Sequence, residues 1–442
     1  MNIRFLLVAL LAAASMADEA VITRVNVISM LEPGVLTDRD VTVRDGRIVA
    51  VGAGGSAETS DGTLVIDGAD RFLIPGLAEM HAHVPVEPEY RDEVLFLWVA
   101  NGVTLARGML GHPDHLVLRD DLLAHRVLGP RLITSGPSFS GRTAGGPAAV
   151  AARVRAQQRD GYDFLKIHPG LTVEEFDALV AAAREVGIGF AGHVTAAVGL
   201  WPSLEAGQTT VDHLDGYFDA LVREDTDVPE GSTLSFGLWL TPFVDPDRIP
   251  AVAERSRALG GAVVPTETLS ENTTGTHRWR AMTERPEFRY LPAELRENYV
   301  VRVQRAALAV TPETGAEYLA LRKRLIVALH DAGVPVLLGS DSPQVFNVPG
   351  FSIHRELEAM VAAGLTPYEA LATGTTAPAA FLRTADWGAI APGRDADLVL
   401  LEADPLADIA NTRKIAGVMV RGRWLDRAEI DAGLAAIAER HR

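Results

Sequence analysis

Residues 73–84 read LIPGLAEMHAHV, an apolar run that ends in two histidines. His81 and His83 are two positions apart, and side chains at i and i+2 of a strand point to the same side. If the run is a strand, its two imidazoles converge on one point, and imidazole is a good ligand for zinc and other first-row metals. The stretch therefore predicts a strand that ends in half of a metal site. A purely structural pair of histidines is the alternative.

The run opens a long region, residues 71–385, in which apolar stretches alternate with helical patterns. One of these helices is expected to follow Thr172, because Glu175 lies three residues later and completes a capping box. Strands that alternate with helices predict parallel βαβ units, and eight such units favour an α/β fold, a TIM-like (β/α)8 barrel. The eight predicted strands are FLIPGLAEMHAH, VTLARGM, RLITSG, DFLKIHP, GIGFAGHV, TTVDHLD, LWLTPFV and VPVLLGSD.

Residues 250–322 follow the seventh of these stretches and are longer, more charged and partly helical. We expect them to form an insertion that covers the barrel mouth and sets the choice of substrate.

Both ends of the chain are rich in strand-like segments. Residues 18–70 include a predicted hairpin whose turn is Asp45-Gly46, a strong hairpin signal. Residues 386–442 include the strand-like runs DLVLLEA and GVMVRGRWL and a C-terminal helical pattern. The simplest assembly is a small β-sandwich domain formed from both ends of the chain, beside the barrel.

The first 17 residues are predicted to be a signal peptide. Arg4 is followed by an apolar run, residues 5–14, that is too short to span a bilayer. Ser15 and Ala17 place small residues at the two positions that a signal peptidase reads. Cleavage after Ala17 predicts a periplasmic or secreted protein. A plain N-terminal strand or a membrane anchor is the alternative.

Composition narrows the partners and the chemistry. The formal net charge is −17, which argues against nucleic acid and against an anionic membrane surface. The chain has no cysteine, so any metal must be held by His, Asp, Glu or a modified Lys. The expected partner is a small-molecule substrate, with no membrane partner after signal removal. Monomer and homo-oligomer both stay open.

Four more polar residues stand at the ends of later predicted strands, where a barrel places its active site: Lys166, His193, His213 and Asp341. Lys166 lies in an apolar stretch, where a bare ammonium is costly. It is either paired with an acid or carbamylated by carbon dioxide to a carboxylate that bridges two metals. Asp341 either binds metal and accepts a proton from its water, or caps a helix.

With these residues in place, the sequence resembles the amidohydrolase superfamily, and within it the imidazolonepropionase-like and Xaa-dipeptidase (prolidase)-like group. The matching stretches include LIPGLAEMHAHV, GYDFLKIH, AGHVTA, TVDHLDG, AGVPVLLGSDSP and GAIAPGRDADLVLLEADPLADI. The resemblance implies a TIM-like barrel, a β-sandwich made from both ends and a two-metal centre.

Carried over by position, the resemblance implies a role for each residue. His81 and His83 would hold the more buried metal, and His193 and His213 the second. Carbamylated Lys166 would bridge two divalent ions, with zinc the expected metal. Asp341 would ligate the first metal and act as general base and acid. Tyr217, four residues after His213, is expected to reach the substrate from a loop, with a plain surface tyrosine as the alternative.

The predicted function is hydrolysis of an amide bond by a hydroxide that bridges two metals. The substrate would be a dipeptide, an N-acyl amino acid or a related carboxamide. Three alternatives stay open: a mononuclear deaminase or cyclic-amide hydrolase, a lactone or ester hydrolase on the same scaffold, and a relative without enzymatic activity.

Overall fold

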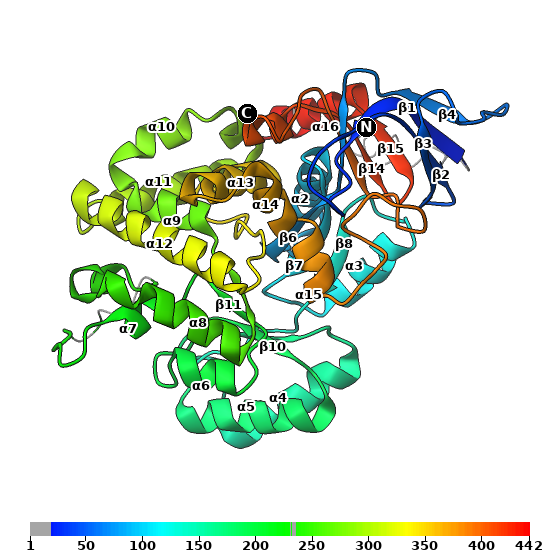
Figure 1. The fold of residues 1–442 in the computed structure, drawn as a ribbon. Helices are drawn as coiled ribbons and strands as arrows, with labels where there is room; N and C mark the ends of the chain where they lie inside the picture. The colour runs from blue at the N-terminus through cyan, green and yellow to red at the C-terminus, as the bar shows by residue number, and fades with distance from the viewer. Residues whose placement is uncertain (1–18, 230, 232–235) are drawn as a thin grey trace.

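The computed structural model describes residues 19–229, 231 and 236–442 (Figure 1). The predicted signal peptide, residues 1–17, lies outside these residues. Within the described ranges, no helix is long and apolar enough to cross a membrane.

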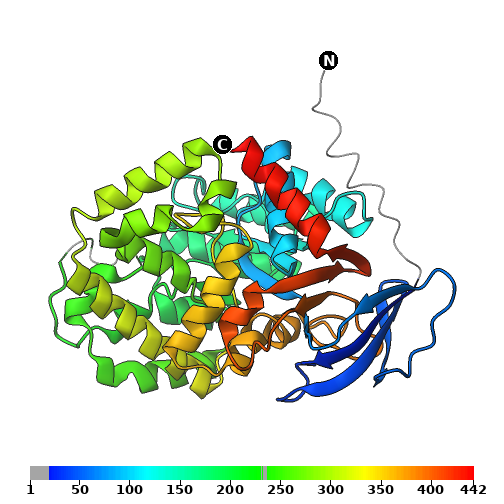
Figure 2. The ribbon, with the colours of Figure 1, turned by 90° about the horizontal axis from the view of Figure 1, so that it is seen from above.

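An eight-stranded mixed sheet, the terminal sheet, is built from both ends of the chain (Figure 2). Its order is β15-β14-β13-β5-β1-β2-β3, and β4 pairs parallel to β1. The Asp45-Gly46 hairpin turn is confirmed, because both residues have positive φ and join β2 to β3. The strands are β1 (Glu19–Val27), β2 (Leu36–Arg44), β3 (Arg47–Ala53), β4 (Leu64–Asp67), β5 (Phe72–Pro75), β13 (Leu398–Leu401), β14 (Ile415–Val420) and β15 (Arg423–Asp426).

The first predicted strand of the central region is split into two. Residues 72–75 form β5, which pairs with β1 and β13 in the terminal sheet. The chain then passes through Gly76 into β6 (Leu77–Ala82). A Cβ at Gly76 would lie 2.1 Å from the hydroxyl of Thr104, so the close approach at this junction requires glycine. The strand that contains His81 is therefore anchored directly in the terminal sheet.

The central strands form two parallel sheets, β6-β7-β8 and β9-β10-β11-β12. Isolated parallel bridges join the end of β8 to β9. The extended segment 335–342 hydrogen-bonds to β12 through Val263 and to β6 through Met80 and His81. Eight extended segments are thus linked, each to a neighbour on both sides. The remaining strands are β7 (Val103–Gly108), β8 (Arg131–Thr134), β9 (Leu165–Ile167), β10 (Phe190–Gly192), β11 (Thr210–Asp212) and β12 (Ala262–Val264).

The seventh predicted strand, LWLTPFV, is wrong. These residues form a 3-10 helix, η2 (Leu238–Phe243), that includes Pro242, which lacks the amide donor that a ladder needs. Strand β12 takes the position beside β11 instead. The predicted insertion, residues 250–322, therefore contains a strand of the sheet. It also contains most of α8 (Ile249–Leu259), all of α9 (Glu267–Thr274), α10 (Trp279–Thr283) and α11 (Ala293–Ala306), and the start of α12 (Pro312–Ala332).

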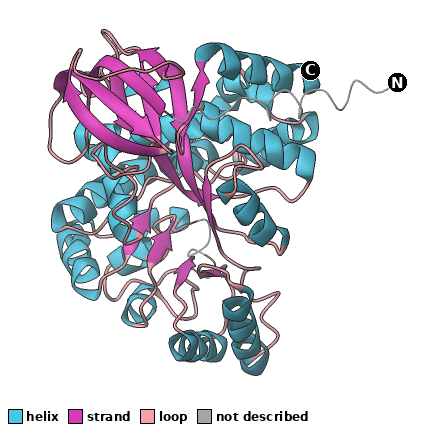
Figure 3. Cartoon of the chain, turned by 90° about the vertical axis from the view of Figure 1, so that its right-hand side faces the viewer, coloured by secondary structure: helices cyan, strands magenta, loops and turns pink. Residues whose placement is uncertain are grey.

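Helices surround the short central strands (Figure 3). The predicted capping box is confirmed at the start of α5, where Thr172 and Glu175 each accept the other's backbone N–H. The other helices are α2 (Pro88–Ala100), α3 (Asp114–Leu123), α4 (Pro147–Asp160), α6 (Leu200–Glu205), α7 (Tyr217–Leu221), α13 (Phe351–Ala363), α14 (Pro367–Thr373), α15 (Thr376–Phe381) and α16 (Arg427–Arg440).

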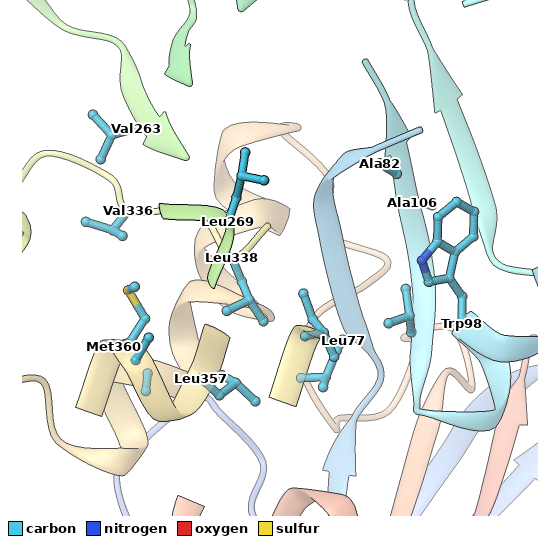
Figure 4. Packing of buried hydrophobic residues seen from close by; sticks show 14 of the residues in the cluster. Leu77, Ala82, Trp98, Ala106, Val263, Leu269, Val336, Leu338, Leu357 and Met360 are labelled. Carbon is cyan, nitrogen blue, oxygen red and sulfur yellow. The ribbon is translucent and has the colours of Figure 1, made fainter. Parts of the chain in front are cut away.

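The main hydrophobic core packs α2, α12 and α13 against β6 and segment 335–342 (Figure 4). Leu77, Trp98, Leu338 and Met360 are each at most 1% exposed. The indole N–H of Trp98 also donates to the Ser342 hydroxyl at 3.3 Å. The core thereby fixes the two segments that contain His81 and Asp341.

Candidate metal centre

The histidines and aspartate predicted from the sequence meet at the carboxyl ends of the central strands. His81 Nε2 lies 3.6 Å from Asp341 Oδ1, and His83 Nε2 lies 2.8 Å from the same oxygen. The ring of His213 is centred 4.6 Å from the His81 ring and 4.6 Å from the His193 ring. One continuous cluster of imidazoles therefore surrounds a buried carboxylate.

Three members of this cluster can hold a metal ion. Ligand atoms of His81, His213 and Asp341 all lie within 4.8 Å of one another, and the three residues are buried. Among the described residues, His81 Nδ1 and Asp341 Oδ1 are buried atoms that lie close to Asp212 and His83 but lack hydrogen-bond geometry with any partner. Such atoms call for an explanation, and imidazole and carboxylate are the donors that zinc takes. The residues present fit a divalent ion.

The helix-capping alternative for Asp341 is excluded by the structure. The next helix, α13, begins only at Phe351, and its N-cap is Gly350. Asp341 instead ends an extended segment, with its backbone N–H bonded to the His81 carbonyl. It is 5% exposed and has positive φ, 60°. The backbone thus turns the carboxylate toward the histidines.

Lys166 is fully buried and pairs with Asp212, a residue that the sequence reasoning missed. Lys166 Nζ and His81 Nδ1 lie 3.4 Å and 3.1 Å from Asp212 Oδ2. Burial lowers the pKa of Lys166. Burial would raise the pKa of Asp212, but Lys166 and Arg107 bring it below its ordinary value. The lysine–acid pair left open by the sequence is therefore present for the unmodified lysine.

Asp212 is itself held by a chain of donors inside the ring of strands. Its Oδ1 accepts the hydroxyl of Thr210 at 2.8 Å, and that hydroxyl accepts from the Arg107 guanidinium at 3.2 Å. Arg107 is buried under the rings of Phe164 and Phe381. The sequence does contain a signal for Asp212, because this carboxylate lies within an apolar strand and directly precedes His213.

Two further residues fix the orientation of the imidazoles. His193 Nδ1 lies 2.6 Å from Asp215 Oδ2, and His213 Nδ1 lies 2.8 Å from the Thr266 hydroxyl. Because that hydroxyl donates to the Pro265 carbonyl, it accepts from His213. Each ring is then protonated on Nδ1 and keeps Nε2 as a free ligand atom. Burial also holds the pKa of His213 well below its usual range, which favours the neutral ring.

The backbone of His213 is held by a buried cation. Arg322 on α12 donates to the His213 carbonyl at 2.9 Å and to the Pro265 carbonyl at 2.7 Å. Its Nε lies 2.7 Å from Glu267 Oε2. Glu356 on α13 accepts the N–H groups of Glu267 and Thr268. Three helices that are distant in sequence, α9, α12 and α13, thus support one histidine of the cluster.

Glu79 joins β6 to segment 335–342. Its carboxylate accepts the N–H groups of Ser340 at 2.7 Å and of His81 at 3.2 Å, and also the Ser340 hydroxyl. Burial raises the pKa of Glu79 to about 8. A Cβ at Gly339 would lie 2.8 Å from the His81 nitrogen, so this glycine permits the close approach. The spacing between His81 and Asp341 is set here.

Tyr217 does not lie where the sequence suggested. It begins α7 rather than a loop, is 1% exposed and packs in the main hydrophobic core. Its hydroxyl bonds to Ser256, and burial raises its pKa to about 12. Both the loop position and the surface alternative are wrong. His168, by contrast, stacks 5.1 Å from the His193 ring at the edge of the cluster.

Several solved structures have a fold similar to that of this chain. Bottromycin amidohydrolase has a similar structure, with 24% identity, a TM-score of 0.75 and coverage of 98% of this chain and 92% of that chain. A Xaa-Pro dipeptidase with bound methionine in the active site is 20% identical, with a TM-score of 0.67 and coverage of 92% and 100%. Molinate hydrolase is 20% identical, with a TM-score of 0.65 and coverage of 93% and 95%.

These three likenesses concern the fold. No protein of curated function matches the sequence significantly. Residues 72–425, however, match the amidohydrolase family. The match spans the strands that hold the histidine cluster and, of the terminal sheet, β5, β13, β14 and most of β15. The chain therefore belongs to the amidohydrolase family, whose members are hydrolases that act on carbon–nitrogen bonds.

Proposed function

We propose that the chain is a binuclear metal-dependent amidohydrolase that cleaves a dipeptide, an N-acyl amino acid or a related carboxamide. The observation that supports it best is the meeting of four histidines, Asp341 and a fully buried lysine at one end of the central strands. We also propose that the eight linked segments form a (β/α)8 barrel. Each segment has a neighbour on both sides, and the histidine cluster lies at the carboxyl ends of the strands, where such barrels have their active sites.

The residues divide into two metal sites in this proposal. His81, His83 and Asp341 would hold one divalent ion, and His193 and His213 the other. Lys166, carbamylated at Nζ, would bridge them, and zinc suits the nitrogen and oxygen donors. Bound there, two ions would polarise the scissile carbonyl and lower the pKa of the attacking water to about 7.

Asp341 is the proposed proton carrier. Its Oδ1 faces His81 and His83 and has no hydrogen-bond partner in the described part of the chain. It can accept a proton from the attacking water and pass it to the leaving amine. We expect Asp341→Asn to lower kcat by about 10²–10⁴-fold, the range for loss of a general acid–base. The exposed Asp331→Asn is the matched control, and an unchanged kcat at position 341 would show that another base acts.

The test of the whole proposal joins a substrate screen with metal analysis of the same sample. We expect amine release from N-acyl amino acids or dipeptides by protein that contains two metal ions per chain. Lys166→Ala should lose metal and activity together, whereas the exposed Lys414→Ala should keep both. Ammonia release with one ion per chain would favour a deaminase, and full activity of Lys166→Ala with two ions would overturn the bridging role.

We further propose export of the protein, on the N-terminal sequence alone. Arg4, the short apolar run and Ala17 support cleavage before Asp18. N-terminal sequencing of the protein recovered from the periplasm or medium should begin at Asp18.

A further inference from the structure

A cavity of about 440 Å³ opens beside the metal centre. Its walls come from η2, α9, α11, α12 and the loop after Asp341, and include Trp239, Val303, Ala306 and Val310. This volume falls in the range of small-molecule sites, about 300–1,000 Å³.

The cavity and the histidine cluster share one wall. The ring of Phe236 lines the cavity and is centred 4.8 Å from the His213 ring and 6.1 Å from the His193 ring. Tyr318, another lining residue, donates its hydroxyl to the Phe236 carbonyl and accepts from Arg322, which holds the His213 backbone. A group in the cavity would therefore belong to a molecule that also reaches the metal centre.

The lining offers little to a polar group. The hydroxyls of Thr273 and Thr274 donate to carbonyls of their own helix, at 2.8 Å and 2.7 Å. Tyr318 is likewise occupied by Phe236. Arg302 is the charged lining residue, and within the described ranges it has no ion-pair partner. A neutral apolar group fits this lining, and Arg302 disfavours a cationic one.

We infer that the cavity is a specificity pocket for a large neutral apolar group of the substrate, either an aromatic or a branched aliphatic one. The inference rests on the proposed amide hydrolysis, because it assigns the group to the hydrolysed molecule. Burial of such a group stabilises the complex by removing apolar surface from water. A small group buries less apolar surface, and a cationic group is repelled by Arg302.

The first test compares two series of N-acyl amino acids, one varied in the acyl group and one in the side chain. In the series whose varied group enters the cavity, kcat/KM should rise about tenfold or more from a methyl to a benzyl group. It should be lowest for a group that carries an ammonium. Ala306→Trp fills the pocket and should lower kcat/KM about tenfold for the benzyl substrate and less than about threefold for the methyl substrate. Gln304→Trp, exposed on the same helix, is the matched control. Equal losses for both substrates, or no size preference in either series, would overturn the inference.

The second test does not depend on turnover. The probe 1-anilinonaphthalene-8-sulfonate should bind wild type and Gln304→Trp alike, and Ala306→Trp about tenfold more weakly. If the probe shows this pattern but no amide is hydrolysed, the pocket stands and the proposed function fails. If amides are hydrolysed without size preference and probe binding is the same in all three proteins, the function stands and the pocket fails.

Discussion

Asp215 orients His193, one of the proposed metal ligands. Its carboxylate lies 2.6 Å from His193 Nδ1 and leaves Nε2 facing the centre. We expect Asp215→Ala to lower zinc affinity about 10–100-fold, as loss of such a partner does. Titration against a competing chelator measures the effect. Asp215→Asn keeps an acceptor oxygen and should lose less zinc affinity than Asp215→Ala. Equal zinc affinities of wild type and Asp215→Ala would contradict the orienting role.

Glu356 makes stability depend on pH. Burial raises the pKa of this carboxyl from 4.5 to about 8, so between these values the folded protein holds a proton that the unfolded chain releases. This contribution is fully present below pH 4.5 and is lost as pH rises through about 8. Glu356→Gln cannot titrate. Urea unfolding at pH 5 and pH 8 should show a larger loss of stability in wild type than in Glu356→Gln, and parallel losses would contradict the prediction.

The members of the histidine cluster could be predicted from the sequence, because each lies at the end of an apolar strand and strand ends meet in an α/β fold. Their supports were not. Thr266 is 53 residues from His213 and Arg322 is 109 residues from it, and only the packing of α9 and α12 brings them together. The prediction for Tyr217 was wrong because its side chain packs into the main core from a short helix, and no local pattern in five residues shows that.

Among the elements, α5 depends on its cap. Thr172 accepts the Glu175 N–H, one of the donors that a helix start leaves unpaired. Thr172→Ala should lower the free energy of unfolding by about 1 kcal/mol. Denaturant unfolding measures it, with the exposed neighbour Val173→Ala as control at less than about 0.5 kcal/mol. A loss no greater than that of the control would show that the cap adds nothing.

The start of α5 was easier to predict than β12 or η2. The capping box of Thr172 and Glu175 involves residues three positions apart, so the sequence shows it. Strand β12 has only three residues, and its hydrogen bonds run to β11 and to residues 335–337, so distant partners define it. Residues 238–243 have the composition of a strand, but Pro242 and the packing of the chain turn them into η2.

For the molecule as a whole, β13 joins two cores. Leu398 and Leu400 face the core of the terminal sheet, whereas Val399 and Leu401 face the main core. We expect Leu400→Ala and Leu401→Ala each to cost about 2–5 kcal/mol and to shift one shared unfolding transition. Urea unfolding followed by circular dichroism and by tryptophan fluorescence tests this. Two separate transitions would show that the cores unfold independently.

The pairing of β5 with β13 also sets an order of events during synthesis. Strand β5 ends one residue before β6, yet its partner begins only at Leu398. At about 5–20 residues per second, the ribosome needs roughly 15–65 s to reach that partner. Until then β5 can pair only with β1, and its other edge is unpaired. The strand that contains the proposed metal ligand His81 therefore gains its full anchor only when nearly the whole chain has been synthesised, and until then the free edge of β5 is open to association with other strands.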